Sequence, residues 1–175
     1  MYSNGWMLKP IPDDLIKVPF HKQQRLIKIL PHRYLPDYDI SLWVDGNIQI
    51  TCDVLKFIQE YDLNLYSFYT RHHPSRDCIF QEARAVLNMK KDIPSIVNPQ
   101  MIQYKKEGLP EHFGMVESCI ILRKHNKPSC VLLDNLWAEQ ILKYSHRDQL
   151  SFNYCLWKLK YEIGYLKIRD FKYCK

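Results

Sequence analysis

Glycine is scarce in this chain, and so are the features that mark linkers, membrane spans and secreted proteins. Only five of the 175 residues are glycine, and no repeat or low-complexity tract occurs, which argues against disordered segments. No stretch reaches the roughly 18 apolar residues of a membrane helix, and residues 1–10 lack the apolar core of a secretory signal. The six cysteines form no C-x-x-C pair and lie in apolar runs, as buried free thiols do. These absences predict a single domain over residues 1–175 in a reducing cytoplasm.

Aromatic and basic residues, by contrast, are plentiful. Aromatic residues make up 13% of the chain, and the formal net charge is +6. A basic surface suits a phosphate-bearing partner such as nucleic acid, an anionic membrane or a nucleotide-linked substrate. No run of five or six consecutive Lys or Arg residues occurs. Nucleic acid is therefore not expected as a partner, and a mildly basic enzyme is the simpler interpretation.

Hydrophobic periodicity predicts strands that alternate with helices. The expected strands are 7–11, 39–44, 65–69, 115–123 and 165–168. The expected helices are 22–30, 53–60, a helix after Asp77, 99–107, 131–144 and 149–162, with Asp53 and Asp77 as N-caps and Gly108 and Gly164 after helix ends. The clearest apolar stripe follows Asp77, at Ile79, Phe80, Ala83, Val86 and Leu87. Such alternation predicts an α/β layered fold.

The segment YDISLWVDGNIQI ends an apolar strand with Asp45, Gly46 and Asn47. In open α/β sheets, ligands bind outside the carboxyl ends of strands. A carboxylate with a neighbouring amide oxygen suits Mg²⁺ or Mn²⁺, which commonly also hold phosphate oxygens. The tripeptide taken alone favours a plain hairpin turn, because Asp-Gly and Gly-Asn are both strong turn pairs.

Four segments, in this order, resemble a known family. The segment RLIKILPHRYLPDYDISLWVDGNIQITCDVLKFI is similar to the central part of GT-A glycosyltransferases. The segments HHPSRDCIFQEA, EGLPEHFGMVESCIILRKHN and SHRDQLSFNYCLWK resemble a glycosyltransferase-like domain family of plant mucilage-related and bacterial polysaccharide-synthesis proteins. The resemblance covers residues 6–158 and implies a GT-A-like (Rossmann-like) three-layer sandwich with a mostly parallel mixed sheet.

The same resemblance implies a nucleotide-sugar-dependent glycosyltransferase acting in surface polysaccharide synthesis. Its donor is expected to be a UDP-sugar and its acceptor a glycan. The alternative that stays open is a catalytically inactive remnant that binds a glycan or a protein.

The resemblance places a donor site around the Asp45 turn. Asp45 matches the first position of the Asp-x-Asp motif, which binds Mn²⁺ or Mg²⁺ and the donor. Asn47 stands at the second position, where its amide brings no charge, and Gly46 lies between them. Arg25 and Lys28 on the preceding helix are donor-binding candidates, although a solvated helix face explains them equally well.

The segment RDQLSFNY resembles the Asp-Gln-Asp segment of related retaining transferases. Asp148 is therefore expected to bind sugar hydroxyls, to stabilise a positively charged sugar centre or to deprotonate an acceptor, with Gln149 bonded to the sugar and Arg147 beside it. A plain helix cap is the alternative interpretation of Asp148. Further candidates for the donor's sugar pocket are Arg76, Asp77 and Glu82, with helix capping and a surface salt bridge as the alternatives. Glu117 is a catalytic candidate that would face the acceptor or the donor, and a solvated strand-end residue is its alternative interpretation. Histidine candidates for a metal ligand are His125 above all, then His72 and His73, though a lone histidine is more often structural.

The resemblance also implies a part that this sequence lacks. A GT-A domain begins with a βαβ segment whose first strand and loop bind the nucleotide base, and that segment would precede Tyr2. The domain is therefore expected to be N-terminally incomplete. A sheet edge would then be exposed, and a partner is expected to cover it.

Overall fold

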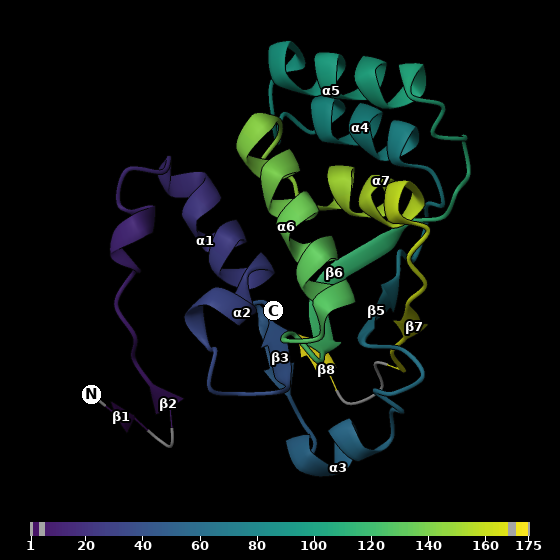
Figure 1. Cartoon of the computed structure of the whole chain (residues 1–175). Coiled ribbons are helices and arrows are strands. Elements are labelled where there is room, and N and C mark those ends of the chain that lie inside the picture. Colours follow the sequence, from purple (N-terminus) through teal and green to yellow (C-terminus); the bar gives the residue numbers. More distant parts are fainter. Residues whose placement is uncertain (1, 4–5, 168–170, 175) are drawn as a thin grey trace.

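A four-stranded mixed sheet lies at the centre of the computed structural model, which describes residues 2–3, 6–167 and 171–174 (Figure 1). Its strand order is β3 (Ser41–Val44), β6 (Val116–Arg123), β5 (Phe68–His72) and β7 (Gly164–Tyr165). Strand β6 runs antiparallel to both β3 and β5, and only β5 and β7 are parallel.

The expectation of a mostly parallel sheet is therefore wrong. Two helices, α4 (Ile79–Asn88) and α5 (Pro94–Lys106), lie between β5 and β6 and pack against each other. An out-and-back helix pair returns the chain to the end of the sheet that it left, so β6 pairs with β5 in the antiparallel sense. A single crossover helix would have favoured a parallel pair.

Helices cover one face of the sheet. Helix α6 (Pro128–Lys143) packs between α1 (Phe20–Ile29) and α7 (Gln149–Leu159), and α4 and α5 lie outside α7 (Figure 1). The core on this face includes Phe68, Ile121 and Trp137. Short connecting elements are the 3-10 turn η1 (Asp13–Leu15) and helix α2 (Pro31–Tyr34), and β1 (Tyr2–Ser3) pairs with β2 (Trp6–Met7).

The opposite face carries a thinner layer. Helix α3 (Val54–Gln59) and the antiparallel pair of β4 (Ile48–Ile50) with β8 (Phe171–Tyr173) cover it. The core here includes Phe57, Ile120 and Leu122. Ile120, Ile121 and Leu122 enter alternate cores because successive strand side chains point to opposite faces. The expected α/β class with three layers is thus present, with a light third layer.

Several predicted boundaries are confirmed. Asp53 caps α3 by accepting hydrogen bonds from the backbone N–H groups of Leu55 and Lys56, at 2.9 and 3.2 Å. Gly108 follows α5 with φ +95°, the left-handed region that favours glycine. Helices α5 and α6 start earlier than expected, because Pro94 and Pro128 occupy their first turns, where proline costs no hydrogen bond.

Other predicted boundaries are wrong. Asp77 does not cap α4; the N-cap is Cys78, and the Asp77 carboxylate lies 2.8 Å from His112 on the surface. Helix α7 ends at Leu159 and is capped by Lys160, with φ +50°, rather than continuing to Glu162 with Gly164 after it. Gly164 instead lies in β7 against the ring of Tyr69, where a Cβ would be only 2.1 Å from that ring.

The strands also differ from the predicted ones near the chain ends. The strand expected at 7–11 is replaced by β2, and residues 8–11 are irregular. The strand expected at 165–168 appears as β7, and its last residue lies outside the described part of the chain. Strand β3 forms one edge of the central sheet, with β6 as its neighbour. A partner that covers this edge stays a prediction.

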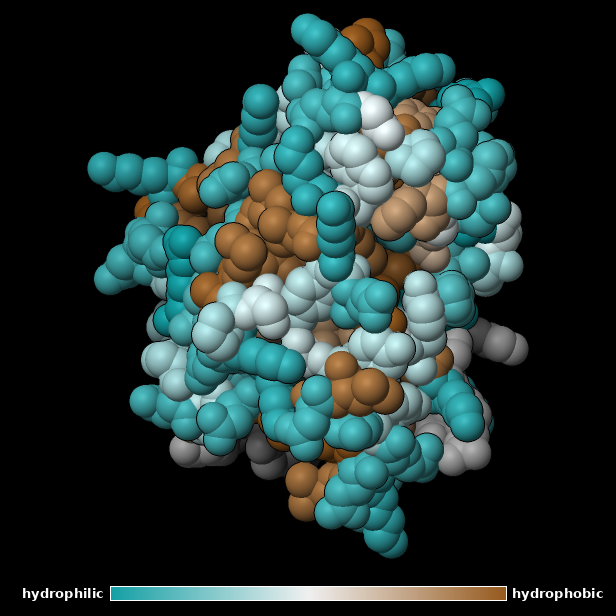
Figure 2. Space-filling model, turned by 45° about the vertical axis from the view of Figure 1, so that its right-hand side comes forward, coloured by the Kyte–Doolittle hydropathy of each residue, from teal (hydrophilic) through white to brown (hydrophobic). Residues whose placement is uncertain are grey.

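One face of the molecule is shown by residue hydropathy in Figure 2. Figure 2 shows hydrophilic side chains across much of the face it presents, with apolar side chains gathered in separate patches between them. Among the described residues, no helix is long and apolar enough to cross a membrane. All six cysteines are free, and four of them are buried.

Candidate functional site

A polar pocket of ≈ 320 Å³ opens where β3 ends and β6 begins. Because these strands are antiparallel, Asp45 after β3 meets Cys119 near the start of β6, and the Asp45 N–H donates to the Cys119 carbonyl at 2.9 Å. Side chains from α1, from the loop after β5, from both ends of α4, from the start of α7 and from β8 complete the walls. The pocket therefore gathers residues that lie far apart in the sequence.

The ammonium of Lys28 lies between two carboxylates. Its Nζ is 2.7 Å from Asp148 Oδ2 and 3.5 Å from Asp45 Oδ1, and it donates to Ser118 Oγ at 3.2 Å. Lys28 is only 1% exposed, so its charge depends on these partners. One buried cation thus joins the turn after β3 to the beginning of α7.

Asp148 is held as a carboxylate. Burial alone would raise its pKa, but the ammonium of Lys28 and the guanidinium of Arg25, whose Nη1 lies 3.5 Å away, lower the pKa to about 2. Its Oδ1 also accepts the N–H of Gln149 at 3.0 Å. Asp148 therefore caps α7, as the plain interpretation expected, and also presents charge to the pocket.

Asp45 is fixed from two sides. Its Oδ1 accepts hydrogen bonds from Trp43 Nε1 at 2.7 Å and from the Lys28 ammonium. The Asp45 carbonyl accepts the N–H of Ile48 at 3.0 Å, so the tripeptide does turn the chain. It makes no hairpin, however, because β4 pairs with β8 rather than with β3.

The pocket contains part of a ligand set for a divalent cation. Asp45 and Asn47 both line the pocket. The bonds of Asp45 to Lys28 and Trp43 use Oδ1, and its Oδ2 accepts no hydrogen bond from the described residues. These oxygens fit an ion such as Mg²⁺, which takes one or two carboxylates and completes its shell with phosphate and water. Within the described ranges, no group of three or more His, Cys, Asp or Glu residues is arranged to hold a metal.

His125, the predicted third metal ligand, does not lie near Asp45 and Asn47. His125 follows Arg123, which pairs with Ser41 at the start of β3, so it lies at the end of β3 opposite Asp45. Its Nε2 lies 3.1 Å from the carbonyl of Leu35, and burial lowers the pKa of its ring.

The other sequence candidates divide into two groups. Those that line the pocket are Arg25, His73, Arg76, Glu82, Glu117, Arg147 and Gln149. Glu117 is engaged by Arg71 at 2.9 Å and by the hydroxyl of Tyr173 at 2.8 Å. Asp77 is not a lining residue, and Gly46 lies in the open turn, where an added Cβ would meet nothing within 4 Å. His72 stacks on the ring of Tyr165.

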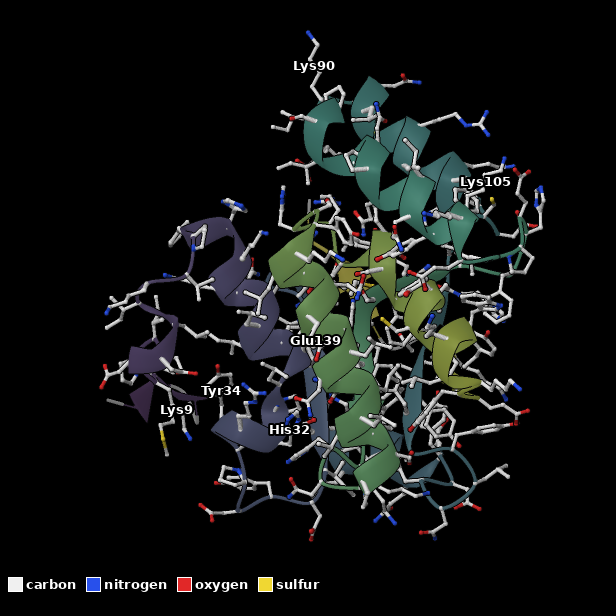
Figure 3. The ribbon with its side chains drawn as sticks, turned by 45° about the horizontal axis from the view of Figure 1, so that its top comes forward. Lys9, His32, Tyr34, Lys90, Lys105 and Glu139 are labelled. Carbon is white, nitrogen blue, oxygen red and sulfur yellow. The ribbon has the colours of Figure 1, made fainter. Side chains whose placement is uncertain are left out.

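Several pocket residues could not be identified as candidates from the sequence. Trp43, which donates to Asp45 without lining the pocket itself, was detectable, since it precedes Asp45 by two positions and therefore shares its side of the strand. Ser118, Lys91 and Tyr173 gave no such signal, because only the folded chain brings them to the pocket. Lys90 extends into solvent at the end of α4 (Figure 3), whereas its neighbour Lys91 lines the pocket.

Comparison with known proteins identifies the family to which this chain is similar. Residues 15–175 match the TOD1/MUCI70 glycosyltransferase-like domain. A relative from Arabidopsis thaliana with the name "Probable hexosyltransferase MUCI70" is 30% identical over 136 residues, which cover 72% of this chain. A second Arabidopsis relative, "Alkaline ceramidase TOD1", is 30% identical over 145 residues, which cover 71% of this chain.

The matched regions span 23% of the first relative and 29% of the second, so the chain corresponds to about a quarter of each. No solved structure matches the chain. The domain match covers nearly the whole chain, including every residue of the Lys28–Asp45–Asp148 cluster. The chain therefore belongs to the TOD1/MUCI70 glycosyltransferase-like domain family.

Proposed function

We propose that this domain transfers a hexosyl group from a nucleotide sugar, with UDP as the nucleoside diphosphate, to a glycan acceptor. The observation that carries the proposal is the pocket in which Lys28 joins the carboxylates of Asp45 and Asp148. Membership of a glycosyltransferase-like family gives the reaction class, and the charges in the pocket fit its demands. Surface-polysaccharide synthesis is the process we assign to it.

When the nucleoside diphosphate leaves, negative charge develops on its phosphate oxygens, and the protein must stabilise that charge. Arg147 and Lys91 line the pocket, and neither makes an ion pair with another described residue. Arg25 lies beside them, with Asp148 as its partner. We assign these three cations to the diphosphate. A Mn²⁺ or Mg²⁺ ion held by Asp45 and Asn47 would supply further positive charge at the same place.

Asp148 is assigned to the sugar centre. Glycosyl transfer develops positive charge at the sugar carbon, and a buried carboxylate stabilises that charge. With a pKa of about 2, Asp148 is ionised at neutral pH and is a weak base. The low pKa therefore favours electrostatic stabilisation over proton abstraction, and Gln149 beside it is assigned to a sugar hydroxyl. Glu117, paired with Arg71, is placed at the acceptor side.

The first test is calorimetry with UDP, with and without Mn²⁺, followed by release of UDP from nucleotide sugars. We expect Asp148→Asn to bind UDP but to lose roughly 100-fold or more in turnover, the size typical of removing one transition-state stabiliser. Asp45→Ala is expected to abolish the part of UDP binding that depends on Mn²⁺. Asp37→Asn, on an exposed residue, is the matched control.

Two results would contradict the proposal. Turnover by Asp148→Asn at the wild-type rate would remove Asp148 from the mechanism. Binding of a glycan without turnover of any nucleotide sugar would favour the alternative, an inactive glycan-binding remnant. Because the second relative is named as a ceramidase, hydrolysis of a ceramide substrate is measured in parallel. We do not expect it, because the charged walls of the pocket disfavour binding of an acyl chain.

A further inference from the structure

One wall of the pocket is formed by a trio that takes no part in the Lys28 cluster. Arg76, Glu82 and His73 come from the loop after β5 and the first turn of α4, and all three line the pocket. The Arg76 Nε donates a short hydrogen bond to Glu82 Oε2, and His73 Nε2 lies 3.8 Å from the same oxygen. Glu82 is only 4% exposed, which makes it a buried carboxylate with defined partners.

The protonation state of His73 follows from its contacts. Its Nδ1 accepts the backbone N–H groups of Ser75 and Arg76, at 3.3 and 3.0 Å, so the neutral ring carries its proton on Nε2. Burial lowers the pKa of His73. The ring therefore presents an Nε2–H donor on the side of Glu82.

The trio has no net charge, unlike the wall that carries Arg147 and Lys91. Glu82 neutralises Arg76, and His73 is neutral at pH 7. Three groups on these lining residues keep hydrogen-bonding capacity: Glu82 Oε1, which bonds to no other described residue, the Nη groups of Arg76 and the Nε2–H of His73. The trio thus offers one charged acceptor, the Glu82 carboxylate, and two donors, the Arg76 guanidinium and the His73 ring N–H.

That pattern matches adjacent hydroxyl groups of a sugar ring, because each hydroxyl both donates and accepts. An anionic group would meet the carboxylate of Glu82 and be repelled. The pocket, at ≈ 320 Å³, has the size of a small ligand site, with room for one sugar ring beside the phosphate-facing cations. Under the proposed function, the ring beside those cations is the one attached to the diphosphate.

We propose that Arg76, Glu82 and His73 bind adjacent hydroxyl groups of the transferred sugar and select an uncharged hexosyl group over a hexuronosyl group. This inference rests on the proposed function. It assigns Arg76 to the sugar ring of the donor, and it names the class of donor that the site accepts.

The test measures the dissociation constants of UDP, UDP-glucose, UDP-galactose and their carboxylate counterparts UDP-glucuronate and UDP-galacturonate. The wild-type protein is expected to bind an uncharged UDP-hexose more tightly than its uronate counterpart. In Glu82→Gln, affinity for that UDP-hexose should fall about tenfold, since a charge-assisted hydrogen bond is lost. The uronate should gain affinity, because Arg76 becomes unpaired, and the dissociation constant of UDP should stay within about twofold.

Arg76→Gln removes the other charged member at a partly exposed position, with 28% of the side chain exposed, and a urea-unfolding midpoint shows whether the buried Glu82 carboxylate tolerates the loss. It too should weaken the UDP-hexose and leave UDP unchanged. Glu139→Gln, on the outer side of α6 (Figure 3), is the control.

Unchanged discrimination in both pocket variants, with UDP still bound, would overturn the subsite and leave the proposed function standing. A wild-type protein that binds the uronates more tightly would also overturn it. Failure of the wild-type protein to bind UDP would overturn the proposed function and the subsite together.

Discussion

At the scale of single residues, Lys28 connects stability to the proposed chemistry. It is the nearest cation to Asp148, and both side chains are removed from solvent, at 1% and 5% exposure. A buried carboxylate that loses its nearest partner is costly, and without Lys28 the ion pair left to Asp148 is the longer one with Arg25, at 3.5 Å. The residue that organises the site is therefore also one that the fold depends on.

We expect Lys28→Met to lower the free energy of unfolding by about 3 kcal/mol at pH 7, the lower end of the usual cost of breaking a buried ion pair, because Arg25 remains 3.5 Å from Asp148. In the wild-type protein, the depressed pKa of Asp148 contributes stability that is present above its unfolded value and is lost as pH falls toward about 2. The difference between wild type and variant should therefore shrink on acidification. Urea unfolding at pH 7 and at about pH 3 measures it.

Lys17→Met, on an exposed lysine before α1, serves as the comparison. A deficit of Lys28→Met that stays the same at both pH values would show that lost packing, rather than an unpaired carboxylate, causes the destabilisation.

At the scale of elements, a second buried ion pair fixes α1 against β6 and α6. Arg123 Nη1 donates to Asp134 Oδ1 at 2.8 Å, and Nη2 donates to the carbonyl of Lys28. Asp134 is fully buried; burial raises its pKa and the Arg123 guanidinium opposes that rise. The pair thus holds the last turn of α1, from which Lys28 reaches the pocket.

Asp134→Asn is expected to destabilise the protein by about 3 kcal/mol or more, because Arg123 would remain buried with its charge uncompensated. Since Arg123 also holds the Lys28 carbonyl, UDP affinity should fall in the same variant. Chemical denaturation and calorimetry measure the two effects, with Asp39→Asn as the exposed control. A variant as stable as wild type would show that the pair contributes no net stability.

Elements whose signal is local could be predicted from the sequence. The apolar stripe from Ile79 to Leu87 identified α4, and Asp53 marked the start of α3. The direction of β6 could not be predicted, because it depends on α4 and α5 packing as a pair rather than on the strand itself. The site shows the same division: Asp45, Lys28 and Asp148 were candidates, but their contact spans up to 120 positions of the chain. No local pattern encodes such a contact.

At the scale of the whole molecule, the response to pH should have two separate parts. Burial lowers the pKa of His73, His125 and His146 below the ordinary value of 6.5. Neighbouring cations and hydrogen bonds lower the pKa of Asp148 and Glu107 to about 2. The histidines and the carboxylates titrate in different ranges, so their effects on stability can be measured apart.

In both pH ranges the free energy of unfolding decreases as the pH falls. An unfolded histidine binds a proton below about pH 6.5 while the buried one resists it, so the unfolded state holds more protons and stability falls as pH decreases. A second loss follows between about pH 4 and pH 2, as the unfolded carboxylates protonate before Asp148 and Glu107. Urea midpoints measured from pH 8 to pH 2 should therefore fall in two stages. His125→Gln should reduce the upper stage and leave the lower one, whereas a midpoint that is constant from pH 7 to pH 5 would show that these histidines titrate alike in the folded and unfolded chain.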